Sequence, residues 1–136
     1  MKTVVVVATR DPHRQAEGLR AALGLTLRGA DVTAVTEPPA SPLAQRAIAT
    51  LEPFGHRVTQ EIDLAADAVE IWTGPQPASF AVARDDRRIL HVVRGVPPPD
   101  GAVAKGDTVV YLSGTTAISH DDLVAAAFAH DLVVTW

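Results

Sequence analysis

The first forty residues constrain the fold of this 136-residue chain more than any other segment. They hold a β-branched run over 3–8, a turn at Pro12, a helical pattern over 13–28 and a second apolar run over 32–36. Because the first run is apolar without alternation, we expect a strand that is covered on both faces, as in a parallel sheet. Gly29 stands where a left-handed residue commonly ends a helix. The segment therefore predicts a strand–helix–strand unit.

The later segments continue this alternation of strands and helices. Ser41 and Pro42 predict the start of a second helix, which ends near 53–55, and Ser119 predicts the cap of a last helix. Further strands are expected over 57–62, 107–112 and 132–135. The segment 65–73 fits a short helix that runs into a strand. The segments 80–83 and 89–93 fit an antiparallel hairpin, and 80–83 also fits part of a loop. Strands that alternate with helices predict one α/β domain over residues 1–136, with a three-layer, flavodoxin-like, mainly parallel sheet and helices on both faces.

The apolar spacing also predicts which side of each helix faces the core. In the first helix the predicted inward residues are Ala16, Leu19, Leu23 and Leu27. In the last helix they are Leu123, Val124, Ala127 and Phe128.

Composition excludes several classes of protein. The net charge of −4 argues against a nucleic-acid partner, because phosphate neutralisation needs clustered Lys and Arg. No apolar segment has the length of a membrane span or a signal-peptide core, so we expect no membrane partner and a cytoplasmic location. The chain has no cysteine, which excludes disulfides, thiolate metal sites and cysteine nucleophiles. It also lacks a glycine-rich nucleotide fingerprint, so we expect no cofactor and no metal.

Two segments resemble a known superfamily. Leu19–Val35, which reads LRAALGLTLRGADVTAV, resembles the first helix and second strand of the DsrE/DsrF-like proteins. Ile118–Trp136 is similar to the end of the DsrH/TusB branch, in which a terminal tryptophan closes the last strand. On these residues the chain resembles a cysteine-free, divergent member of the DsrE/DsrF/DsrH-like (TusB/TusC/TusD-type) superfamily, and the region 55–105 matches no part of it.

The resemblance implies a small α/β domain that assembles into trimers or hexamers. In its sulfur-relay members it implies persulfide carried on a cysteine, and persulfide transfer requires a thiolate. Because this chain has none, the resemblance implies a non-catalytic, oligomer-forming accessory subunit. Its expected partners are copies of itself, as a dimer, trimer or hexamer, or cysteine-bearing relatives in a hetero-oligomer.

A different hypothesis is a binding module for a small anionic or phosphorylated ligand. In a parallel sheet, ligands bind beyond the carboxyl ends of the strands, where three loops of this chain are expected to gather. Their candidate ligand-binding residues are Arg10, Asp11, His13, Glu37, Ser113, Thr115 and Thr116. The alternative is that Arg10 pairs with Asp11 at the surface and that His13 only begins a helix. A hydrolase or isomerase that uses Arg10, Asp11 or His13 is a third hypothesis.

The remaining candidates have structural explanations beside functional ones. His120 and the two aspartates that follow it fit a metal or acid–base cluster, but also the acidic first turn of a capped helix. Trp72 and Trp136 are the only tryptophans and are candidate interface residues, because aromatic residues are enriched at interface centres. Ordinary packing at the end of the last strand is the alternative for Trp136.

Overall fold

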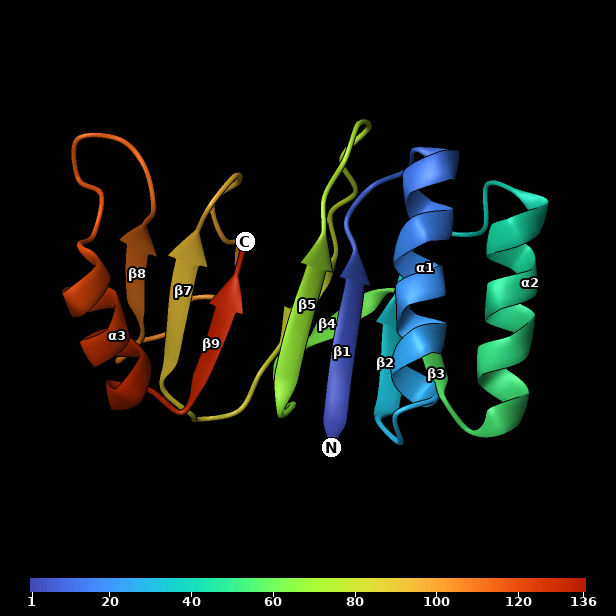
Figure 1. Ribbon diagram of the computed structural model, residues 1–136, viewed down its shortest axis with the longest axis horizontal. Helices are drawn as coiled ribbons and strands as arrows, with labels where there is room; N and C mark the ends of the chain where they lie inside the picture. The colour runs from blue at the N-terminus through green and yellow to red at the C-terminus, as the bar shows by residue number, and fades with distance from the viewer.

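The computed structural model describes residues 1–136 and shows a mixed α/β fold with mainly parallel strands (Figure 1). A four-stranded sheet has the order β3 (Arg57–Thr59), β2 (Asp31–Val35), β1 (Lys2–Val7) and β5 (Ala68–Trp72). All of its pairings are parallel, and Thr3 lies opposite both Val32 and Ala68. The predicted strand–helix–strand unit at the N-terminus is confirmed, and the segment 65–73 contains a strand.

A second parallel sheet has three strands. Its order is β8 (Thr108–Tyr111), β7 (Ile89–Val93) and β9 (Leu132–Thr135). A short parallel pair joins β4 (Glu61–Asp63) to β6 (Ala81–Ala83). The antiparallel hairpin over 80–93 is therefore wrong, because β6 and β7 each pair with other strands. β5 and β9 lie side by side, but they belong to separate hydrogen-bonded sheets (Figure 1).

Local capping explains where the helices begin. The Ser41 and Ser119 hydroxyls accept backbone N–H bonds of 3.2 Å at the starts of α2 and α3, as predicted, and Asp11 caps α1 in the same way at 2.9 Å. Gly29 has φ +82°, the left-handed conformation expected after the first helix. The bounds are α1 (Pro12–Thr26), α2 (Pro42–Leu51), the 3₁₀ turn η1 (Glu52–Phe54) and α3 (His120–Ala129).

α1 and α2 cover one face of the four-stranded sheet (Figure 1). The core here includes Val5 and Val7 of β1 packed against Leu19 of α1. The predicted inward stripe of α1 is wrong at Leu27, which is 89% exposed, whereas Gln15 is fully buried. Gln15 is buried because its amide binds the loop after β2. Its Nε2 donates to Thr36 Oγ1 and to the Glu37 and Pro38 carbonyls, and its Oε1 accepts from Ala40 N.

The opposite face of the sheet is covered by strands and loops. Val4 and Val6 pack here in one cluster with Leu64 and Trp136. The other buried members come from β2, β4, β7, β9 and the loops after β4 and β7: Val35, Ile62, Ala66, Ile89, Ala102, Leu132 and Val134. This shared cluster joins the two sheets into one core.

Candidate functional site

The structure brings two of the three predicted strand-end loops together. Arg10 Nη2 lies 3.4 Å from Glu37 Oε1. Asp11 caps α1, and His13, whose side chain is 91% exposed, lies 3.6 Å from Glu17. Arg10 N donates to the Gln76 carbonyl at 2.7 Å, which ties the loop after β1 to the loop after β5.

The third predicted loop lies elsewhere. Ser113, Thr115 and Thr116 follow β8, the edge strand at the opposite end of the molecule from α1 and α2 (Figure 1). The strands β5, β9 and β7 stand between β1 and β8, so these hydroxyls are separated from Arg10. The order of the strands, which the sequence did not specify, causes this separation.

A buried polar network supports the C-terminus. The Asp107 carboxylate, 1% exposed, accepts bonds from the Arg84 guanidinium, His91 Nε2 and the backbone N–H groups of Ile89 and Ala104. Burial raises the pKa of Asp107, but these hydrogen bonds outweigh it and hold that pKa well below its ordinary value. The bond to Asp107 in turn raises the pKa of Arg84.

The same network orders Trp136. Its indole Nε1 donates to His91 Nδ1 at 3.0 Å, and the two rings stack with centroids 6.0 Å apart. Since an indole N–H can only donate, His91 Nδ1 accepts and the ring proton sits on Nε2, which donates to Asp107. Trp136 is only 6% exposed, which agrees with the alternative of ordinary packing. Sequence spacing could not reveal this network, because Asp107 and Trp136 lie 16 and 45 positions from His91.

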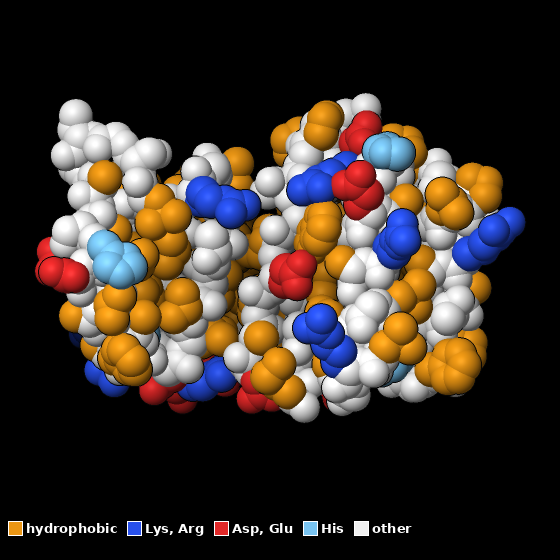
Figure 2. Space-filling model, in the orientation of Figure 1, with side chains coloured by type: hydrophobic (Ala, Val, Ile, Leu, Met, Phe, Trp, Pro, Cys, Tyr) orange, Lys and Arg blue, Asp and Glu red, His pale blue; other side chains and the backbone are white.

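The helix α3 carries an unusual apolar surface. None of its ten residues is buried, although seven of them are Leu, Val, Ala or Phe. The prediction that Val124 and Phe128 face the core is wrong, because Val124 is 42% and Phe128 88% exposed. We call these two side chains, with the exposed Ala125 and Ala129, the α3 surface. Figure 2 shows hydrophobic side chains gathered over this part of the molecule.

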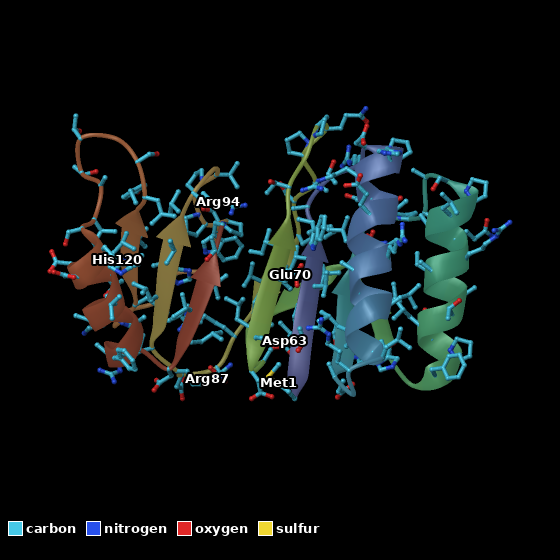
Figure 3. All side chains as sticks on the ribbon, viewed as in Figure 1. Met1, Asp63, Glu70, Arg87, Arg94 and His120 are labelled. Carbon is cyan, nitrogen blue, oxygen red and sulfur yellow. The ribbon has the colours of Figure 1, made fainter.

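The acidic start of α3 has a structural role. Ser119 caps the helix, and Asp121 and Asp122 occupy its first turn, where the helix dipole favours negative charge. His120 lies at this end of the helix (Figure 3). No group of three or more His, Cys, Asp or Glu side chains is placed to hold a metal ion.

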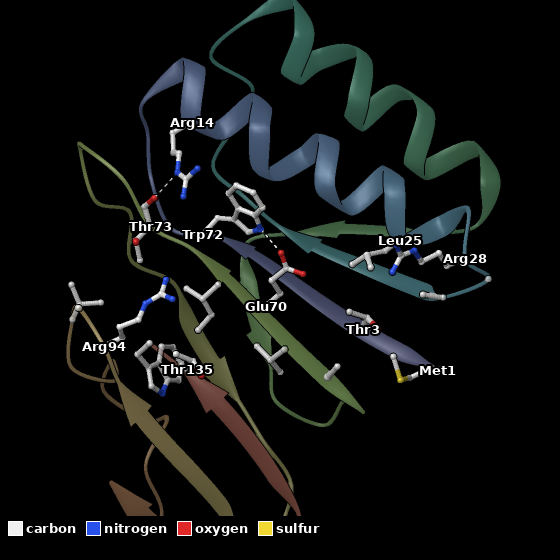
Figure 4. A pocket seen from close by; sticks show the side chains of 18 residues that line it. Met1, Thr3, Arg14, Leu25, Arg28, Glu70, Trp72, Thr73, Arg94 and Thr135 are labelled. Atoms are coloured by element: carbon white, nitrogen blue, oxygen red, sulfur yellow. Dashed lines mark hydrogen bonds between the residues drawn. The ribbon is translucent and has the colours of Figure 1, made fainter. Parts of the chain in front are cut away.

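An open groove of about 850 Å³ runs along β5 between α1 and the C-terminal end of β9 (Figure 4). Trp72 lies in it with the Arg14 guanidinium 4.5 Å from the centre of its ring, and its Nε1 donates to Glu70 Oε1 at 2.7 Å. Arg94, at the end of β7, faces Glu70 of β5 across this groove (Figure 3). None of the predicted ligand-binding residues lines the groove, whereas both candidate interface tryptophans do.

No family model matches the chain, and no curated protein or solved structure matches it. None of the three helices has the length and apolar character that a membrane crossing requires.

Proposed function

We propose that this protein is a non-catalytic, oligomer-forming accessory subunit of the DsrE/DsrF/DsrH-like kind. The observation that carries the proposal is the α3 surface, in which Phe128 is 88% exposed on a helix with no buried residue. A contiguous apolar face on a helix is normally covered, since water solvates such a surface poorly. An isolated ten-residue helix is also marginal in water, so packing by a second chain would stabilise α3.

The absence of cysteine sets the role of such a subunit. Without a thiolate the chain cannot hold persulfide, so its contribution to an assembly is structural or regulatory. Copies of the chain would form a homo-oligomer, and cysteine-bearing relatives would supply the reactive thiol in a hetero-oligomer.

A doubly wound α/β arrangement belongs to the same proposal. The parallel order β3-β2-β1-β5 supports it, because the chain adds β2 and β3 on one side of β1 and then returns to add β5 on the other. This order differs from the flavodoxin-like order, in which the third strand lies on the other side of β1, and strands and loops rather than helices cover the second face of the sheet.

Sedimentation velocity over a range of concentrations tests the assembly. We expect a stable oligomer for the wild type and at least a tenfold weaker association for Phe128→Asp, because buried aromatic residues dominate interface energies. Phe54→Asp is the matched control, since Phe54 is 77% exposed in η1, directly after α2, and lies outside the α3 surface. A wild type that stays monomeric, alone and when co-expressed with a cysteine-bearing relative, would contradict the proposal.

The second candidate function is a binding module for a small anion at the strand-end loops. Arg10 favours it, because its side chain is 64% exposed beside the N-terminus of α1 and has only the 3.4 Å contact with Glu37. Titration with inorganic phosphate tests this candidate. Arg10→Gln should remove phosphate binding, and an affinity that Arg10→Gln leaves unchanged would exclude the site.

A further inference from the structure

The groove along β5 has the dimensions of a small-molecule site. Its volume of about 850 Å³ falls within the range of about 300–1,000 Å³ that is typical of ligand pockets. Its walls are α1 on one side and Gly95, Val96 and the end of β9 on the other, so it crosses the junction between the two sheets. Figure 2 shows this junction as a hollow with basic side chains on both of its banks.

The charges in the groove oppose the charge of the whole chain. Three arginines line it, Arg14, Arg28 and Arg94, against one acidic side chain, Glu70. Arg14 is paired with Glu17 at 2.7 Å, but neither Arg28 nor Arg94 forms an ion pair. In a chain of net charge −4, three guanidinium groups beside one acidic side chain make this groove locally positive, which favours an anion.

The arginines stand at two ends of the groove (Figure 4). Arg14 and Arg94 lie near Thr73, at the carboxyl end of β5, and Arg28 lies near Thr3 at the other end. The five residues of β5 separate these ends by about 13 Å, at about 3.3 Å per residue. The hydroxyl of Thr3 is buried and has no hydrogen-bond partner, which is uncommon. This end of the groove therefore contains a polar group whose hydrogen-bonding capacity is unused.

Between its arginine-lined ends the groove holds apolar and aromatic side chains beside the Glu70 carboxylate. Trp72 and Trp136, the only tryptophans of the chain, both line it, together with Leu25 and Val96. Half of all the lining residues are hydrophobic. Such a surface favours a planar or apolar ligand body, because aromatic rings gain from stacking and from the removal of water.

We propose that this groove binds an elongated organic anion, with a planar apolar body over β5 and its phosphate or carboxylate group held by Arg94 beside Arg14, or by Arg28. The site is independent of the α3 surface, so its occupation and the assembly of the protein can be tested separately.

Isothermal titration calorimetry with three probes tests the chemistry. ADP combines a planar base with a diphosphate, pyrophosphate has the charge without the base, and adenosine has the base without the charge. We expect ADP to bind at least tenfold more tightly than either fragment, with an affinity that falls as salt is added. Pyrophosphate binding equal to that of ADP would overturn the planar body, equal adenosine binding would overturn the anionic group, and no binding of any probe at millimolar concentration would overturn the site.

Arginine variants test the location. Arg94→Gln and Arg28→Gln remove exposed side chains with no ion pair, so both variants should fold, and at least one should bind ADP about fivefold more weakly than the wild type. Arg20→Gln is the matched control, because Arg20 is exposed on α1 but does not line the groove. An equal loss of affinity in Arg20→Gln, or no loss in either groove variant, would show that ADP binds elsewhere and would overturn the proposal.

Discussion

Replacing Asp107 with asparagine removes the charge at the centre of the buried network and leaves its shape nearly unchanged. In the wild type, the Asp107 carboxylate neutralises Arg84, whose side chain is only 12% exposed. It also accepts a hydrogen bond from His91 Nε2, with 2.7 Å between the nitrogen and the oxygen. An asparagine has one acceptor oxygen, and its NH₂ group would face donors that now bind the second carboxylate oxygen. The variant therefore leaves a guanidinium without a counter-ion and at least two N–H donors without an acceptor.

The expected cost follows from these lost contacts. Removing one partner of a buried ion pair costs about 3–5 kcal/mol. Arg84 keeps bonds to the Ala102 and Arg87 carbonyls, both 2.7 Å long, so we expect the lower part of that range. A loss of about 3 kcal/mol is a large share of the roughly 5–15 kcal/mol that stabilises a domain. For a chain of this size it lowers the melting temperature by about 10 °C.

The effect should also depend on pH. The pKa of Asp107 is lowered in the folded protein, so this carboxylate stabilises the fold above its unfolded pKa of about 4. That stabilisation is lost as the pH falls through the lower folded pKa. The difference in unfolding free energy between wild type and Asp107→Asn should therefore stay constant at pH 5–8 and decrease below about pH 4.

Urea denaturation at a series of pH values measures this difference directly. Asp86→Asn is the control, because Asp86 is exposed and should change stability by less than about 0.5 kcal/mol. A loss below about 1 kcal/mol for Asp107→Asn at pH 7, or a difference that grows in acid, would refute the argument that the buried charge supports the fold.

Two further substitutions separate packing from local propensity. Gly24→Ala should raise the unfolding free energy by about 0.5–1 kcal/mol, because α1 gains a better helix former and the new Cβ meets nothing within 4 Å. Gly18→Ala should lower the unfolding free energy, because its new Cβ would lie 2.9 Å from Val7 Cγ2. Thermal melts measure both variants, and stabilisation of both would contradict the packing of α1 against β1. Trp136→Phe keeps a ring beside His91 but removes the indole donor, so we expect a loss of about 1–3 kcal/mol in urea denaturation, and an unchanged midpoint would show that the hydrogen bond is not needed.

Local signals predicted the helix boundaries of this fold well, but the expected strand over 57–62 is divided into β3 and β4, which belong to different sheets. The caps at Ser41 and Ser119 and the left-handed Gly29 are at the predicted positions. Each of these features depends on residues within one helical turn, so a short stretch of sequence contains the whole interaction.

The direction of the helix faces was predicted less well, for two different reasons. Gln15 is buried because its amide satisfies the loop after β2, a contact more than twenty residues away. Phe128 is exposed because the chain brings no element to cover the outer side of α3. Apolar spacing indicates which residues prefer to be buried, but it contains no information about what is available to bury them.

The sequence by itself determined the mixed α/β class, the parallel N-terminal unit, the helix starts and the absence of thiol chemistry. Only the tertiary structure decided the strand order, which separates Ser113, Thr115 and Thr116 from Arg10, and the convergence of Arg84, His91, Asp107 and Trp136. The same order placed Arg28, Arg94 and Trp72 around one groove. The physical reason is range: caps and turns are set by neighbours along the chain, whereas strand order and buried charge pairs depend on how distant segments pack together.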